Sequence, residues 1–166
     1  MSIDSCGFSL AACVGWPRKE TNVRRYLVVA HKTLGGARLL DHLHELRDQD
    51  PYCTFHLLVP EYHPFGAWDD HGVRVAAQAT LDEMLGRLAT MRIGATGEIG
   101  DVDPVYAVGE TLRREGDDAF AGIVLSTLPK GISRWWKFDV PRRMAEQYRW
   151  LPVTHLVANE ALVPAP

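Results

Sequence analysis

Short apolar runs alternate with longer amphipathic segments along this chain, and turn residues bound each run. The runs at 26–30 and 121–125 consist mostly of aliphatic residues over about one strand length, which is typical of strands buried on both faces. Between residues 37 and 47, leucines recur at helical spacing, as in a helix with one buried side. The whole pattern predicts strands at 26–30, 52–59, 95–99, 121–125 and 152–158, with helices over 37–47, over 69–91, from Pro104 onward and from 139 to about 148.

Two aspartates mark predicted helix starts. Asp103 precedes Pro104, which is the arrangement of an N-cap followed by proline at the first helical position. Asp139 has Pro141 just inside the next helix and is predicted to cap it in the same way. Asp103 is therefore better explained as a cap than as one half of a carboxylate pair with Asp101.

Strands that alternate with helices predict a parallel sheet covered by helices on both faces. In such sheets, ligands bind beyond the carboxyl ends of the strands, where the strand order reverses. The candidate site loops are therefore the four segments that follow strands, at 31–36, 60–68, 100–103 and 126–138. With 166 residues, the chain corresponds to one domain. We expect an α/β domain over 23–158, a loosely ordered N-terminal extension over 1–22 and a C-terminal tail over 159–166.

Composition and charge narrow the class of protein. Hydrophobic residues make up 46% and charged residues 23% of the chain, as in ordinary globular proteins. The net charge of −3 argues against a protein that binds nucleic acid or a membrane surface through a general positive charge. No apolar run approaches the ~20 residues that a membrane span needs. Three cysteines form no disulfide framework. We therefore expect a cytoplasmic protein that binds neither nucleic acid nor membrane.

Four segments together resemble the universal stress protein family, in particular its divergent small actinobacterial-type members. They read Tyr-Leu-Val-Val-Ala at 26–30, Gly-Asp-Val-Asp-Pro at 100–104, Ile-Val-Leu-Ser-Thr at 123–127 and Leu-Pro-Val-Thr-His-Leu-Val at 151–157. The resemblance spans most of the chain between Arg25 and Ala158. It implies a doubly wound, parallel five-stranded sheet of order 3-2-1-4-5, the adenine-nucleotide-hydrolase-like (HUP) sandwich. It further implies a switch point between the first and fourth strands and a homodimer formed through the last strand.

Many members of that family bind ATP through a Gly-x2-Gly-x9-Gly-Ser/Thr segment after the fourth strand, and this chain departs from it. Of those glycines only Gly131 remains, and Asp139 stands where ATP binders have Gly-Ser or Gly-Thr. Pro129 offers no N–H group to a phosphate. If the Asp139 carboxylate lay 4 Å from a phosphate near the protein surface, the two charges would repel each other by on the order of 4 kcal/mol. These departures argue against ordinary ATP binding and leave the cofactor, ATP or AMP included, unidentified.

The same stretch is rich in cations that could hold an anion without a glycine loop. Residues 127–150 contain six Lys or Arg and two Asp or Glu, a net charge of +4 that leaves −7 for the rest of the chain. The leading hypothesis is a non-enzymatic, stress-related regulatory module that binds a nucleotide or similar small anion between the first and fourth strands. In it, His31 and Thr33 contact base or ribose, whereas Ser126, Thr127, Lys130, Gly131 and Arg134 contact phosphate or other anionic groups.

Other interpretations stay open. The basic residues could be solvated, and Trp135 and Trp136 could anchor a homodimer or partner interface together with the last strand, as Trp and Arg often do. A weak hydrolase is a third hypothesis, built on Ser126 near His31, although no Gly-x-Ser-x-Gly elbow is present. We predict no metal site, because no histidine spacing matches a standard zinc site.

Overall fold

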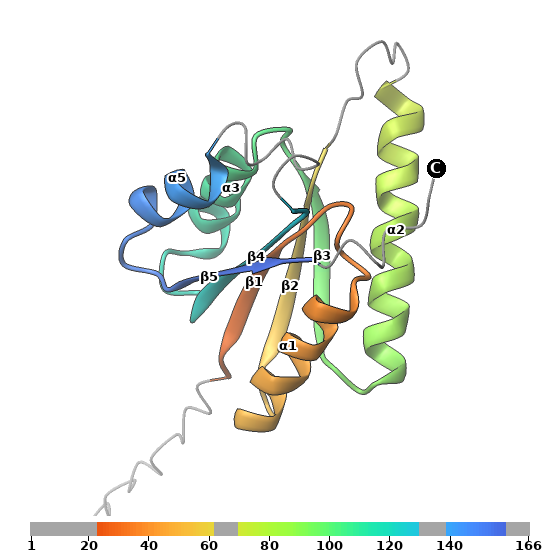
Figure 1. Ribbon diagram of the computed structural model, residues 1–166, viewed down its shortest axis with the longest axis vertical. Coiled ribbons are helices and arrows are strands. Elements are labelled where there is room, and N and C mark those ends of the chain that lie inside the picture. Colours follow the sequence, from red (N-terminus) through yellow and green to blue (C-terminus); the bar gives the residue numbers. More distant parts are fainter. Residues whose placement is uncertain (1–22, 62–69, 130–138, 159–166) are drawn as a thin grey trace, which may run out of the picture.

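The computed structural model describes residues 23–61, 70–129 and 139–158 (Figure 1). The extension over 1–22 and the tail over 159–166 lie outside these residues, so the expectations about them stay untested. The described chain forms five strands, namely β1 (Arg25–Val29), β2 (Thr54–Pro60), β3 (Ala95–Gly100), β4 (Gly122–Thr127) and β5 (Val153–Val157). The helices are α1 (Ala37–Gln49), α2 (Asp70–Thr90), α3 (Pro104–Glu115) and α5 (Val140–Gln147).

The strands form one sheet in the order β3-β2-β1-β4-β5, and every neighbouring pair is parallel. This confirms the predicted α/β class, the parallel sheet and the strand order. Several predicted boundaries differ from the observed ones by one or two residues. The difference that matters for the site is that β4 continues through Ser126 and Thr127, which the hydrophobic pattern assigns to the following loop. The reason is that both residues still pair with β5, opposite Leu156 and Val157, although their side chains are polar.

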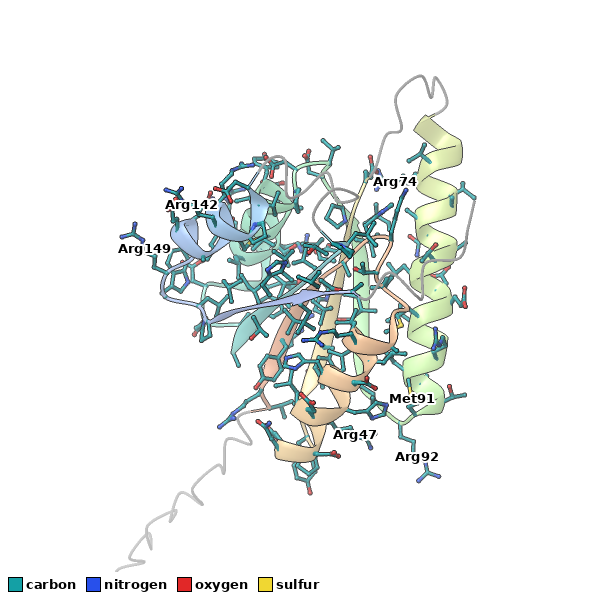
Figure 2. The ribbon with its side chains drawn as sticks, viewed as in Figure 1. Arg47, Arg74, Met91, Arg92, Arg142 and Arg149 are labelled. Carbon is teal, nitrogen blue, oxygen red and sulfur yellow. The ribbon has the colours of Figure 1, made fainter. Side chains whose placement is uncertain are left out.

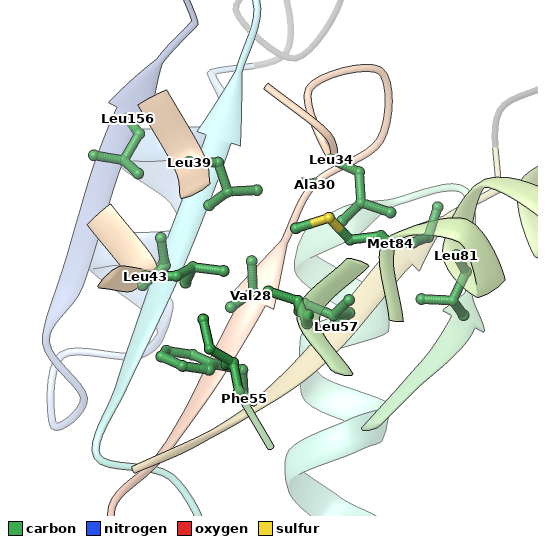
Figure 3. Packing of buried hydrophobic residues seen from close by; sticks show 14 of the residues in the cluster. Val28, Ala30, Leu34, Leu39, Leu43, Phe55, Leu57, Leu81, Met84 and Leu156 are labelled. Atoms are coloured by element: carbon green, nitrogen blue, oxygen red, sulfur yellow. The ribbon is translucent and has the colours of Figure 1, made fainter. Parts of the chain in front are cut away.

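In the described part of the chain, α1 and α2 cover one face of the sheet, and α3 and α5 cover the other (Figure 1). On one face, α1 and α2 bury Leu39, Leu43, Leu81 and Met84 against alternate residues of the central strands (Figure 3). On the other face, α3 and α5 bury Val108, Leu112 and Met144 in a second cluster. The Arg47 guanidinium also donates to the Met91 carbonyl at 2.6 Å, which joins the end of α1 to the chain just after α2 (Figure 2).

The helix starts differ from one another in how their first amides are satisfied. Asp103 caps α3 as predicted, because its side chain accepts from the amides of Val105 and Tyr106. The prediction for Asp139 was wrong: its backbone is left-handed, with φ 50° and ψ 36°, and its side chain makes no cap hydrogen bond to α5. The left-handed turn directs the carboxylate away from the amides, and it instead lies 3.9 Å from Arg142 Nε.

None of the helices in the described part of the chain is long and apolar enough to span a membrane.

Candidate functional site

The carboxyl ends of β1 and β4 form the candidate site, because the next described helices after these two neighbouring strands pack on opposite faces of the sheet. The register places Val29 of β1 opposite Leu125 of β4. After β1 the chain passes into α1 on one face of the sheet, whereas the helix after β4, α5, packs on the other face. A crevice at the point of divergence is the usual ligand site of doubly wound sheets.

The loop after β1 is fixed by short hydrogen bonds. The His31 carbonyl accepts from the Leu34 amide at 3.1 Å, and the Thr33 carbonyl accepts from the Gly36 amide at 3.0 Å. The Thr33 hydroxyl is buried and donates to the Ser126 carbonyl at 3.0 Å. The tertiary structure therefore brings together three of the predicted site residues, and Thr33 links the two strand ends directly.

Ser126 and Thr127 are buried at the end of β4. The Thr127 hydroxyl lies 2.8 Å from Nε2 of His155 on β5, and the Thr127 carbonyl accepts from the Ala158 amide. The Thr127 hydroxyl therefore joins the ends of β4 and β5. A hydroxyl that makes one hydrogen bond retains further bonding capacity, so the predicted contacts of Ser126 and Thr127 with a ligand stay predictions.

His31 is half-buried, two residues beyond the end of β1. Burial, and then the charge of neighbouring Lys32, lower the pKa of its imidazole. The lowered pKa favours the neutral form of the ring, which can offer a hydrogen bond to a ligand. Burial lowers the pKa of His155 in the same direction.

The remaining predicted contacts, Lys130, Gly131 and Arg134, lie outside the described residues, as do Trp135 and Trp136. The structure neither brings them to the crevice nor separates them from it. Their proposed roles therefore rest on the sequence alone.

The amino end of α1 faces the same edge of the sheet, since α1 follows β1 after one short loop. Its N-cap is Gly36, which has no side chain to accept from the first amides, and the first helical turn contains no acidic residue. Unpaired N–H groups and the helix dipole make such an end favourable for a negative charge. No carboxylate of the helix itself competes for that position.

Sequence reasoning missed a polar network on the α3 side of the sheet. Buried His56 is within 3.2 Å of Glu98 through Nε2 and within 3.1 Å of the Arg25 guanidinium through Nδ1. Glu98 also accepts from the Thr111 hydroxyl at 2.7 Å and from Arg114 at 2.6 Å. Burial opposes ionisation of Glu98, but these hydrogen bonds outweigh it and hold the pKa of the carboxyl below its ordinary value. The available signal was His56, a histidine inside an otherwise apolar strand.

This network borders a hollow of about 340 Å³ at the carboxyl ends of β2 and β3. Its charged lining is mixed, with Glu61 paired to Arg74 at 2.9 Å and Glu98 paired to Arg114. Each of these acids is thus already neutralised by an arginine. Within the described ranges, no group of three or more His, Cys, Asp or Glu could hold a metal ion.

Comparisons with known proteins agree with the architecture. The chain is similar in structure to a protein from the universal stress protein family from Burkholderia pseudomallei, with a TM-score of 0.54 and 14% sequence identity over 82% of this chain and 97% of that one. A universal stress protein in complex with cAMP also aligns, over 82% of this chain and 97% of its own, at 13% identity and a TM-score of 0.47. No protein-family model and no curated protein sequence matches the chain. The protein therefore has the fold of the universal stress proteins, and the resemblance inferred from the sequence is confirmed at the level of the fold.

Proposed function

We propose that the protein is a stress-related regulatory module that binds a nucleotide or a similar small anion at the crevice between β1 and β4, without chemistry of its own. One observation carries the proposal: the strand order reverses between these two parallel neighbours, and the amino end of α1 opens beside them without a side-chain cap or an acidic first turn. The fold shared with universal stress proteins is consistent with it.

The proposed contacts divide into two groups. His31, whose lowered pKa favours the neutral ring, suits hydrogen bonding to a base or ribose, with Thr33 two residues away. Ser126 and Thr127 would offer hydroxyl groups to the anionic part of the ligand. Lys130, Gly131 and Arg134 supply the charge and the bare backbone in this proposal, in place of the glycine-rich segment that the chain lacks.

Thermal unfolding with added ligand tests the proposal. Millimolar ATP, AMP, cyclic AMP and inorganic phosphate are compared, and at least one should raise the unfolding midpoint, because a ligand at 100 times its Kd stabilises the folded state by about 2.7 kcal/mol. Lys130→Ala combined with Arg134→Ala should remove the shift. The matched control is Arg24→Ala with Arg149→Ala, which removes two positive charges from the opposite edge of the sheet. The proposal fails if no compound shifts the midpoint or if both double variants weaken the shift equally.

A second candidate is a homodimeric or partner-binding module without a ligand. The observation in its favour is that β5 is an edge strand, paired among the described residues to β4 alone, with half-buried side chains at three of its five positions. In this candidate the partner pairs with β5, and Trp135 and Trp136 anchor it. Light scattering of the purified protein measures its oligomeric mass and tests this candidate. A dimer mass that falls in Trp135→Ala or Trp136→Ala supports this function. A monomer mass for the parent and both variants rejects the homodimer.

A further inference from the structure

The amino-terminal edge of the sheet, opposite the crevice, exposes large apolar side chains. Val23 is 45% exposed just before β1, Tyr52 is 79% exposed before β2, and Trp150 is 58% exposed before β5. Burying an aromatic side chain is strongly favourable in water. This edge is therefore a surface on which another apolar segment would gain stability.

A groove of about 470 Å³ lies at this edge, between the carboxyl-terminal halves of α3 and α5. Leu112, Tyr148 and Trp150 form its apolar wall. The Tyr148 hydroxyl donates to the Val105 carbonyl at 2.7 Å, and its ring meets the Trp150 ring edge-on at 5.7 Å. On the α3 side is Gly109, where a Cβ atom would come within 2.8 Å of the Tyr148 hydroxyl. The groove is thus preformed, and its volume is in the range that takes a bulky group.

The chain itself enters the fold beside this groove. The Arg25 side chain reaches the Glu115 carboxylate at 2.7 Å, and the next residue, Gly116, lines the groove. The Arg25 carbonyl accepts from the Ala121 amide at 2.7 Å, at the start of β4. An extended chain covers roughly 3.3–3.6 Å per residue. The seven residue steps from Val23 back to Trp16 therefore span up to about 25 Å, which is ample for Trp16 to reach the groove.

The sequence of residues 8–19 complements the groove in polarity and charge. It reads Phe-Ser-Leu-Ala-Ala-Cys-Val-Gly-Trp-Pro-Arg-Lys, an apolar stretch followed by two cations. Beside the groove, Asp117 and Asp118 are exposed and form no ion pair with any of the described residues. An apolar group in the groove with cations outside it would meet an aromatic wall and two carboxylates. Arg113 also lines the groove, but its charge is paired with Glu110.

We propose that the groove between α3 and α5 is the docking site for the N-terminal segment 8–19 of the same chain. Trp16 occupies the hollow against Trp150, and Arg18 and Lys19 lie beside Asp117 and Asp118. Because the segment is tethered a few residues away, its effective concentration at the groove is in the millimolar range. The site is at the opposite end of the sheet from the crevice and does not depend on a ligand there.

Disulfide trapping in the full chain tests the docking. Cys13 lies in the segment, and Asp117→Cys places a second thiol at the groove. Burial raises the pKa of the Cys53 thiol, so it does not compete in the exchange. The matched control is Asp48→Cys, which is also an exposed aspartate near the same edge but lies on α1, on the other face of the sheet. Under mild oxidation, D117C should form the intramolecular disulfide with Cys13 at least tenfold faster than D48C, as measured by mass spectrometry of non-reduced peptides.

A second substitution tests the role of the aromatic wall. Trp150→Ala in the D117C background should slow the disulfide several-fold and speed tryptic cleavage after Arg18 and Lys19, while circular dichroism stays unchanged because Trp150 is largely exposed. Equal trapping rates for D117C and D48C overturn the proposal, and so does trapping that is indifferent to Trp150. Disulfides found only between two chains also overturn it and assign the groove to a second copy.

Discussion

The two faces of the sheet are built from the same strands but differ in character. On the α1–α2 face, β2 contributes Phe55, Leu57 and Val59 to an apolar core. On the α3–α5 face, the residues between them are His56 and Leu58, and only Leu58 joins the apolar cluster. His56 instead joins the network of Arg25, Glu98 and Thr111. Alternate residues of a strand point to opposite faces, so one strand serves both environments.

The difference follows from the path of the chain. The crossover through α3 runs from β3 at the edge to β4 beyond β1, so α3 packs toward the middle of the sheet and leaves the outer part of β3 half-buried. Polar groups at such a position can keep contact with water while they bond to one another. The comparison teaches that the position at which a crossover helix packs on the sheet, rather than the strand sequence alone, decides which strand residues lie in a core without water.

The largest expected effect is on the apolar face. Leu81→Ala removes a fully buried side chain of α2 and should lower the free energy of unfolding by about 2–5 kcal/mol through lost burial and the cavity left behind. Val75→Ala, at a largely exposed position of the same helix, is the control and should change it by no more than about 0.5 kcal/mol. Urea unfolding measures both, and equal losses would contradict the assignment of the core.

On the polar face, we expect Glu98→Gln to cost about 1–3 kcal/mol at pH 7, because Arg114 and His56 lose their charged acceptor. The pKa of Glu98 is held below its ordinary value, so its contribution is fully present above that value and is lost as pH falls through the lower folded-state pKa. The difference between variant and parent should therefore shrink below about pH 4.

Urea unfolding at pH 7 and at low pH checks this expectation. Glu83→Gln on α2 serves as the exposed control and should show no such pH dependence. A Glu98→Gln variant as stable as the parent at pH 7 would mean that the network adds nothing to the polar face.

The smallest effect concerns the helices on the polar face. Asp103 caps α3 and also binds Arg143 of α5 at 2.9 Å, so Asp103→Ala should cost about 1 kcal/mol. Asp139→Asn removes the same charge at the start of α5, where no cap bond is made and Asn tolerates the left-handed backbone. It should change the free energy of unfolding by less than about 0.5 kcal/mol. If the two substitutions prove equal in thermal or urea unfolding, the distinction between these helix starts is incorrect.

The two aspartates also show where sequence reasoning reached its limit. Asp103 and Asp139 stand in similar local patterns, because Pro104 directly follows Asp103 and Pro141 comes two residues after Asp139. Only Asp103 adopts the extended backbone that lets its side chain turn toward the helix amides, whereas Asp139 is left-handed. Local pattern predicted both helix starts, but the backbone conformation of the aspartate itself decided whether its side chain caps the helix.

In the candidate site, too, some features followed from the sequence and others only from the tertiary structure. The sequence placed His31, Thr33, Ser126 and Thr127 near strand ends, and the strand pairing joined them through the Thr33–Ser126 hydrogen bond. The sequence could not predict that the Thr33 and Thr127 hydroxyls form hydrogen bonds within the protein, since the partner of Thr127 is His155 on another strand. Arg25, His56 and Glu98 escaped notice because no short motif connects them.

By itself, the sequence determined the kinds of element and their alternation, because hydrophobic periodicity and turn residues act over a few neighbouring positions, and these imply a parallel α/β sheet. Only the tertiary structure decided which polar groups meet, since the contacts of Arg25 with His56 and Glu115 join residues 31 and 90 positions apart. It also decided where a groove stays open between α3 and α5, because a hollow depends on how helices from separate parts of the chain pack together.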